Sequence, residues 1–198
     1  MNNLSINTKR LRIPFGLAIL CGLVYTMNIN MGTRWIWENF GMKPGEPLLS
    51  RFWTLWTSQI IHGGADHLTG NISVFAPTAI YLAFKGFKFR NLYWVMPFVG
   101  LFVWTFGNGY STHGGFSGVV FFAVTCAILE MFSQTKLKIV DAAYAIYALS
   151  HIAMLVVLVT PMQGVSSEGH LAGVIASGIW YLNRNYKIIF ALNLTKKH

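Results

Sequence analysis

With 198 residues, of which 54% are hydrophobic and only 11% charged, the chain is too apolar for an ordinary soluble domain. Its formal net charge of +9 would suit a nucleic-acid-binding protein, but the distribution of the basic residues argues against that function. The hydrophobic residues occur in separate blocks, which predicts an all-α polytopic membrane protein whose first partner is the lipid bilayer.

Six apolar blocks are candidates for transmembrane helices. Several of them are shorter than the roughly 17–25 residues of a full span, so their helices must extend into polar flanks or the bilayer must thin locally. No internal repeat or second soluble domain is evident, and a single membrane domain is expected over residues 1–198. The blocks are 13–31, 67–84, 92–106, 116–132, 142–161 and 169–182.

The basic residues predict the orientation of these helices, because short loops rich in Lys and Arg stay in the cytoplasm. When loops are assigned to alternating sides, most of the 15 basic residues share one side with both termini. Residues 1–12 then form a basic cytoplasmic N-terminus and residues 186–198 a basic cytoplasmic tail. Residues 32–66 form an external segment between the first two helices. No partnership with nucleic acid is predicted.

The first apolar block follows basic residues, as the core of a signal peptide would, but no small-residue cleavage site follows it, so a retained helix is expected. Cys21 and Cys126 lie in apolar blocks without the spacing of metal ligands and are interpreted as packing residues.

The external segment is rich in aromatic residues, which favour the interface between membrane and water. Proline and glycine at positions 41–47 make a long regular helix in its middle unfavourable. The aromatic residues are Trp35, Trp37, Phe40, Phe52, Trp53 and Trp56.

The second predicted helix opens with polar residues. Asp66 is expected to cap its N-terminus, and His67 and Asn71, four residues apart, share one face of the helix. Polar side chains inside a membrane helix are costly unless they face a cavity or a partner. A metal site using His62, Asp66 and His67 is the alternative, but it lacks the His-x-x-x-His spacing that places two imidazoles on one face. No metal site is therefore predicted.

The stretch Gly115-Phe116-Ser117-Gly118 precedes the fourth apolar run and has two interpretations. Small residues allow membrane helices to pack closely. Alternatively, Ser117 is a nucleophile in a tight turn whose backbone N–H is available to an oxyanion. His113, four residues earlier, is a candidate for the rim of a cavity.

The sixth predicted helix opens with His170, and Gly173 and Ser177 provide a face of small residues for contact with another helix. With both termini inside, the second, fourth and sixth helices run in the same direction. His67, Asn71, Ser117 and His170 then lie at one depth, just below the outer surface. A nucleophile, a base and two hydrogen-bond donors at a common level indicate a catalytic site.

This constellation resembles the rhomboid family of intramembrane serine proteases. The resemblance is carried by His67-x-x-x-Asn71, Gly115-Phe116-Ser117-Gly118 and His170-x-x-Gly173, and it spans residues 53 to 182. It implies a six-helix bundle in a bacterial cytoplasmic membrane, with a site opening to the periplasmic or extracellular side. It also implies a cofactor-free dyad that cleaves transmembrane protein substrates near their outer ends.

The resemblance also assigns roles to individual residues. Ser117 is the nucleophile and His170 the general base, while the oxyanion is met by the Ser117 N–H, the His67 ring and the Asn71 amide. Phe121, one turn below Ser117, occupies the position of an aromatic residue that packs against the base histidine. Supporting positions are Gly115, Gly118 and Gly173.

Some positions depart from the family pattern. Thr54 follows Trp53 where an arginine is usual, which predicts an altered anchor for the external loop. Two alternatives also stay open: a rhombosortase-like enzyme that trims C-terminal sorting tails, and a non-proteolytic protein that binds membrane clients. The sequence specifies neither the natural substrate nor the oligomeric state.

Overall fold

A computed structural model describes residues 8–133, 138–150 and 166–195, and all regular secondary structure in these ranges is helical. This confirms the all-helical part of the predicted fold class for the described residues. Short 3₁₀ turns occupy Thr8–Leu11, Leu48–Arg51 and Phe89–Asn91. The helices are α1 (Arg12–Met31), α2 (Thr33–Phe40), α3 (Thr54–Thr57), α4 (Ala65–Phe84), α5 (Leu92–Phe106), α6 (Ser117–Phe132), α7 (Ile139–Ser150) and α9 (Ser167–Thr195).

The predicted apolar blocks coincide with α1, α4, α5, α6, α7 and α9, with two differences. The last block was expected to end at residue 182, but α9 continues to Thr195. The prediction for Asp66 is wrong, because Gly64 occupies the N-cap of α4 and no side chain caps the helix. Residues 151–161 of the fifth block, including His151, lie outside the described residues.

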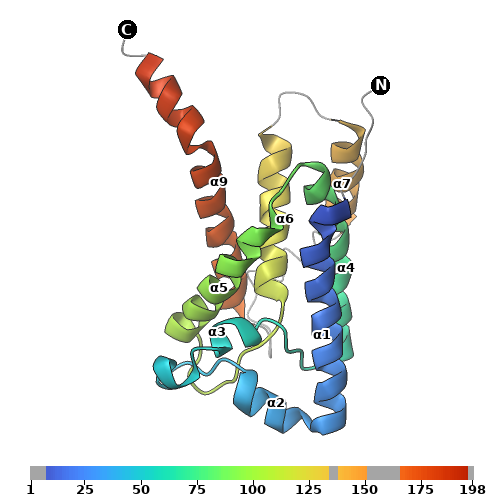
Figure 1. The fold of residues 1–198 in the computed structure, drawn as a ribbon, viewed down its shortest axis with the longest axis vertical. Coiled ribbons are helices and arrows are strands. Elements are labelled where there is room, and N and C mark those ends of the chain that lie inside the picture. The colour runs from blue at the N-terminus through green and yellow to red at the C-terminus, as the bar shows by residue number, and fades with distance from the viewer. Residues whose placement is uncertain (1–7, 134–137, 151–165, 196–198) are drawn as a thin grey trace.

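Helix α6 lies at the centre of the bundle and contacts α9, α4 and α5 (Figure 1). The starts of α4, α6 and α9 lie at one end of the molecule, whereas the start of α1 and the end of α9 lie at the other end (Figure 1). The polar residues that open α4, α6 and α9 are thereby brought to the same level.

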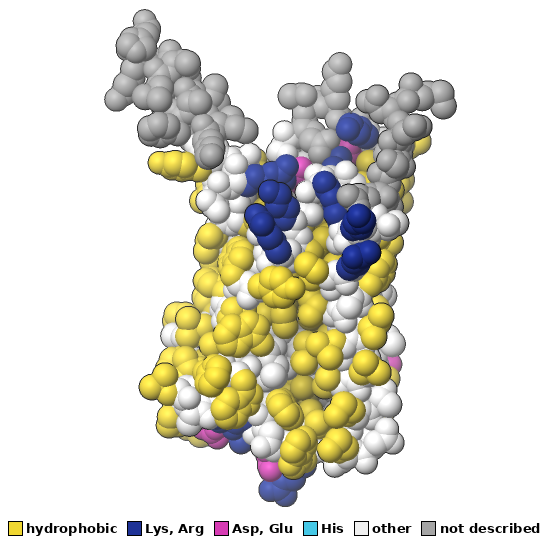
Figure 2. Space-filling model, in the orientation of Figure 1, with side chains coloured by type: hydrophobic (Ala, Val, Ile, Leu, Met, Phe, Trp, Pro, Cys, Tyr) yellow, Lys and Arg dark blue, Asp and Glu magenta, His cyan; other side chains and the backbone are white. Residues whose placement is uncertain are grey.

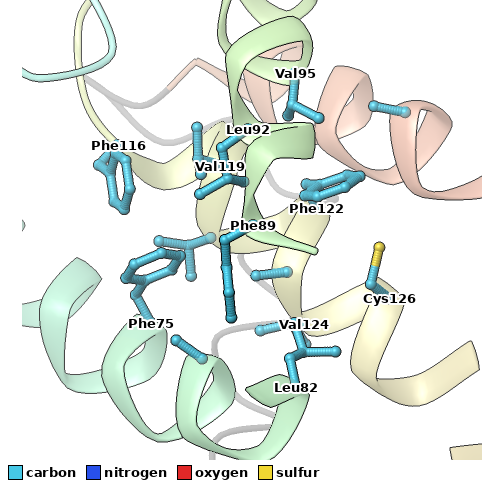
Figure 3. Packing of buried hydrophobic residues seen from close by; sticks show 14 of the residues in the cluster. Phe75, Leu82, Phe89, Leu92, Val95, Phe116, Val119, Phe122, Val124 and Cys126 are labelled. Atoms are coloured by element: carbon cyan, nitrogen blue, oxygen red, sulfur yellow. The ribbon is translucent and has the colours of Figure 1, made fainter. Parts of the chain in front are cut away.

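The core between these helices is formed by large apolar side chains (Figure 3). Phe75 of α4 meets Phe116 edge to face, with ring centroids 4.8 Å apart, and Phe122 and Cys126 of α6 are fully buried. Cys21 and Cys126 are both free and buried, which confirms their interpretation as packing residues. Because lipid tails are as apolar as these side chains, close packing rather than exclusion of water holds the helices together.

On the face shown in Figure 2, the surface is a broad hydrophobic band, with Lys and Arg side chains gathered above it at the end where α1 begins. Apolar side chains are also strongly exposed, and Ile19, Leu23 and Leu182 are each about 60% exposed. By length and composition, Thr8–Met31 is the one described helical segment able to cross a membrane on its own, with a mean hydropathy of 1.5. The number of spans and their orientation stay predictions.

The segment between α1 and α4 is anchored by Arg51. Its Nη1 donates to Glu46 Oε2 at 2.7 Å, and its Nη2 donates to the carbonyl oxygens of Glu38 and Gly41. Trp104 of α5 donates its indole N–H to the Glu46 carbonyl at 2.9 Å. An arginine three residues before Thr54 therefore ties the segment to itself, and Trp104 ties it to α5.

Glycines allow α6 and α9 to touch through their backbones. A Cβ atom at Gly173 would overlap the carbonyl oxygen of Gly118 and would lie 2.9 Å from the Phe122 nitrogen. A Cβ atom at Gly118 would lie 2.8 Å from the carbonyl oxygen of Gly169. Backbone atoms cannot give way as flexible side chains do, so these positions require glycine.

This contact predicts that Gly173→Ala destabilises the protein by roughly 1–3 kcal/mol, because the added methyl group forces α6 and α9 apart. The measurement is thermal unfolding in detergent. Gly178→Ala on the same helix is the matched control, because a Cβ atom there meets nothing within 4 Å. Equal stability of the two variants would contradict the backbone contact.

Candidate active site

Ser117 is the first residue of α6 and follows a sharp turn at Gly115. Gly115 has a φ of +134°, its N–H donates to the Ser58 carbonyl at 2.8 Å, and a Cβ atom on it would lie 2.6 Å from Cε1 of His67. A side chain at 115 is therefore excluded both by the backbone conformation and by the His67 ring. The turn holds Ser117 beside the start of α4.

His170 lies in the first turn of α9 and is 2% exposed. Its ring packs on Phe121, with centroids 4.2 Å apart, as the resemblance implied. Phe121 is one turn along α6 from Ser117, and the backbones of the two helices meet at Gly118 and Gly169, the neighbours of Ser117 and His170. The structure thus places the serine and the histidine on adjoining turns of touching helices.

Neither ring nitrogen of His170 has a hydrogen-bond partner among the described residues, so a Ser117–His170 hydrogen bond is not formed in this structure. Both nitrogens are buried, and a buried imidazole without a partner is unfavourable unless a ligand or a conformational change supplies one. In unliganded enzymes, catalytic hydrogen bonds are often long and tighten only with substrate.

Glu168 does not serve His170. Its carboxylate accepts a hydrogen bond from Ser166 Oγ at 3.1 Å, and the same hydroxyl accepts the N–H of Gly169 at 3.2 Å. Ser166 therefore caps α9 and fixes the turn that carries His170.

His62 connects the three segments of the site. Its Nε2 lies 3.1 Å from Asn71 Nδ2 and 3.3 Å from the Phe116 backbone nitrogen, and its Nδ1 lies 3.3 Å from the Ile60 carbonyl oxygen. Two donors aim at Nε2, so Nε2 is the unprotonated acceptor and Nδ1–H donates to Ile60. With both nitrogens engaged, His62 is not available as a metal ligand.

His67 and Asn71 both lie against this histidine. The rings of His62 and His67 meet edge to face with centroids 5.1 Å apart, and Asn71 is buried. The Asn71 amide nitrogen carries two hydrogens and gives only one to His62. The second hydrogen remains for another acceptor. The structure therefore brings His67 and Asn71 to the turn before Ser117, although their catalytic roles stay predictions.

Asn28 of α1 is a site residue that the sequence analysis missed. It is 2% exposed, and its Nδ2 donates to the His62 carbonyl oxygen at 3.1 Å. An asparagine within an apolar span is costly unless it has a partner, and this cost was the signal that could have identified it. Through Asn28, α1 supports the loop that holds His62.

A small cavity of about 20 Å³ adjoins Ser117, close to the space that one water molecule needs. Ser58 and Gln59 also line it, and Gln59 Oε1 is buried without a partner among the described residues. His113 lines the same cavity, as predicted, and exchanges two backbone hydrogen bonds with Met42, at 2.9 and 2.7 Å.

The fold and the site together define a helical protein with an apolar exterior and, at one end, a buried histidine on a turn that adjoins a half-buried serine. A family model described as the Rhomboid domain matches residues 49–184, more than half of the chain. The chain therefore belongs to the rhomboid family, whose members are integral membrane proteins and generally intramembrane serine proteases. A search of curated proteins found no match to the chain.

The His62 network predicts a pH-dependent stability. Burial lowers the pKa of His62 to about 4, and the nearby His67 acts in the same direction. The unfolded chain titrates near the ordinary pKa of about 6.5, so stability falls as the pH drops from about 6.5 to about 4. The loss from this group is on the order of 3 kcal/mol. Thermal unfolding in detergent between pH 7 and pH 4 measures it.

His62→Gln should flatten this pH dependence, because glutamine does not titrate. His113→Gln, on the loop beside the cavity, is the control and should retain the steep dependence of the unsubstituted protein. If His62→Gln lost stability with falling pH as steeply as the control, the stability change would arise elsewhere.

Proposed function

We propose that this rhomboid is an intramembrane serine endopeptidase that uses Ser117 as nucleophile and His170 as general base to cut transmembrane segments near their outer ends. The observation that supports it most directly is the backbone contact between α6 and α9 at Gly118, Gly169 and Gly173. It holds the half-buried Ser117 and the buried His170 on adjoining turns. The oxyanion donors and the phenylalanine under the base lie next to them.

In the first step, His170 accepts the Ser117 hydroxyl proton while the serine oxygen attacks the carbonyl carbon of the scissile peptide bond. A new C–O bond forms, and the electron pair of the C=O bond moves onto the oxygen. His170 must be the neutral imidazole for this step. Its burial against Phe121 favours that form, because an imidazolium without a partner is poorly solvated there.

The oxyanion forms at the N-terminus of α6, where the first backbone N–H groups have no acceptor within the helix. The Ser117 N–H is one donor. The His67 ring and the second hydrogen of the Asn71 amide are the others, and both side chains are positioned by His62. Donors that are already oriented lose little free energy to reorganisation when the charge develops.

Collapse of this intermediate breaks the C–N bond, and His170 returns the proton to the leaving amine. Water then attacks the acyl-enzyme with His170 again as base, which releases the carboxylate and regenerates the serine. The cavity beside Ser117 provides space for this water. Side chains and water are sufficient for every step.

A transmembrane substrate must unwind locally before it reacts, because a formed helix hides its carbonyl carbons within hydrogen-bonded turns. We therefore expect a preference for small or helix-destabilising residues near the scissile bond.

The proposal predicts that Ser117→Ala and His170→Ala each lower the rate of cleavage of a single-span substrate in proteoliposomes by roughly 10³-fold or more. Removing either group eliminates the activated nucleophile. Ser111→Ala and His113→Ala, which change the same residue types in the adjoining loop, should leave most of the activity.

Undiminished cleavage by Ser117→Ala would refute the proposal. A second substrate, with the cleavable segment at the C-terminal tail, separates an endopeptidase of single spans from a rhombosortase-like enzyme. Preference for the tail would favour the latter. Retention of a client without any cleavage would favour the non-proteolytic alternative.

Phe121 is predicted to position the base. Phe121→Leu keeps an apolar residue but removes the ring face on which His170 lies, so kcat should fall by about 10-fold with little change in KM. Phe121→Tyr keeps the ring and should retain activity. A larger effect on KM than on kcat in Phe121→Leu would mean that Phe121 contacts substrate instead.

A further inference from the structure

A second pocket lies at the opposite end of the molecule, between the connection from α4 to α5 and the middle of α9. Its volume is about 370 Å³, far larger than the cavity beside Ser117. Its inner wall is apolar, formed by Phe87 and Trp180, whose rings lie 5.0 Å apart and are both buried. The polar side chains at its outer edge are Lys88, Asn91, Asn183 and Arg184.

The pocket is positively charged. Among the described residues that line it none carries a carboxylate, and the guanidinium of Arg10 lies beside Gly86 at its edge. Arg184 lies over the Trp180 ring at 5.3 Å and binds both carboxylate oxygens of Glu130. A guanidinium has five N–H donors, and Glu130 engages only two, so Arg184 is held in place with donors left over.

The pocket also lies at a boundary on the surface of the molecule. The hydrophobic band ends where the basic side chains begin (Figure 2). On α9, Ile179 and Leu182 are exposed next to the pocket residues Trp180 and Asn183. A buried tryptophan below a basic cluster is typical of the depth at which lipid headgroups meet acyl chains.

We propose that this pocket binds the phosphate group of an anionic phospholipid, with the acyl chains lying along the exposed apolar residues of α9. Guanidinium and ammonium groups pair with phosphate oxygens, and the amides of Asn91 and Asn183 add neutral donors. Basic pockets between membrane helices bind such headgroups. A soluble phosphate would use the same donors but would leave Ile179 and Leu182 without a role, so the lipid is favoured.

This site is independent of the proposed peptidase chemistry, because none of its residues lies near Ser117. Lipid binding would give the basic residues at this end of the protein a function in addition to their predicted role in orienting the helices in the membrane. An occupied pocket would connect the α4–α5 loop to α9, the helix that carries His170 at its other end.

The test is titration of the full-length protein in detergent with phosphatidylglycerol or phosphatidylcholine, with bound lipid counted by native mass spectrometry. We expect phosphatidylglycerol to bind more tightly than phosphatidylcholine. Lys88→Gln should weaken that binding about fivefold, because one cation near the headgroup is removed. Arg90→Gln removes an exposed cation from the same loop outside the pocket and should have no comparable effect.

Asn183→Asp provides a second variant on an exposed turn of α9, and its added negative charge should also weaken phosphatidylglycerol binding. If Lys88→Gln and Arg90→Gln weakened phosphatidylglycerol binding equally, the lipid would be attracted by the overall charge of the loop and not by the pocket, and the proposal would be overturned. Equal affinity for phosphatidylglycerol and phosphatidylcholine would also overturn it. A third titration, with inorganic phosphate, distinguishes the source of the ligand. Displacement of phosphatidylglycerol by millimolar phosphate would assign the pocket to a soluble ligand and overturn the lipid assignment.

Discussion

The contact between the backbones of α6 and α9 is the constraint on which the site depends. Hydrophobic association gives little driving force between helices in lipid, so the two helices are held by how closely they approach. Gly118 and Gly173 allow that approach, and their neighbours Ser117 and His170 lie on the turns that meet. A methyl group at either glycine would separate the helices and, with them, Ser117 from His170.

Buried hydrogen bonds between polar groups hold the other segments of the site in fixed positions relative to one another. His62 accepts hydrogen bonds from Asn71 and from the Phe116 N–H, and Asn28 supports its carbonyl from α1. Each of these groups is buried, where an unsatisfied donor or acceptor costs about 1–3 kcal/mol. The network therefore specifies one arrangement of α1, α4 and the turn before α6. Among the described residues, both ring nitrogens of His170 still lack a hydrogen-bond partner, as do Asn28 Oδ1 and Gln59 Oε1.

Much of this could be predicted from the sequence. The apolar blocks located α1, α4, α5, α6, α7 and α9 but not the short helices α2 and α3. The alternation of loops placed Ser117, His67 and His170 at one end of the bundle. The tertiary hydrogen bonds could not be predicted, because the roles of Asn28 and His62 depend on which segments touch and not on local pattern. Asp66 was wrongly predicted as a cap, since Gly64 adopts the extended conformation of the N-cap and the helix begins two residues earlier than an Asp66 cap implies. The end of α9 was also missed, because polar residues after Leu182 do not by themselves stop a helix.

The central claim is that the Ser117 hydroxyl is activated by the His170 imidazole. The most direct test is reaction of the detergent-solubilised protein with a fluorophosphonate, followed by peptide mass spectrometry to locate the adduct. The account predicts one adduct, on Ser117, that disappears in Ser117→Ala and forms far more slowly in His170→Ala. An adduct on another serine, or a rate in His170→Ala equal to that of the unsubstituted protein, would contradict it.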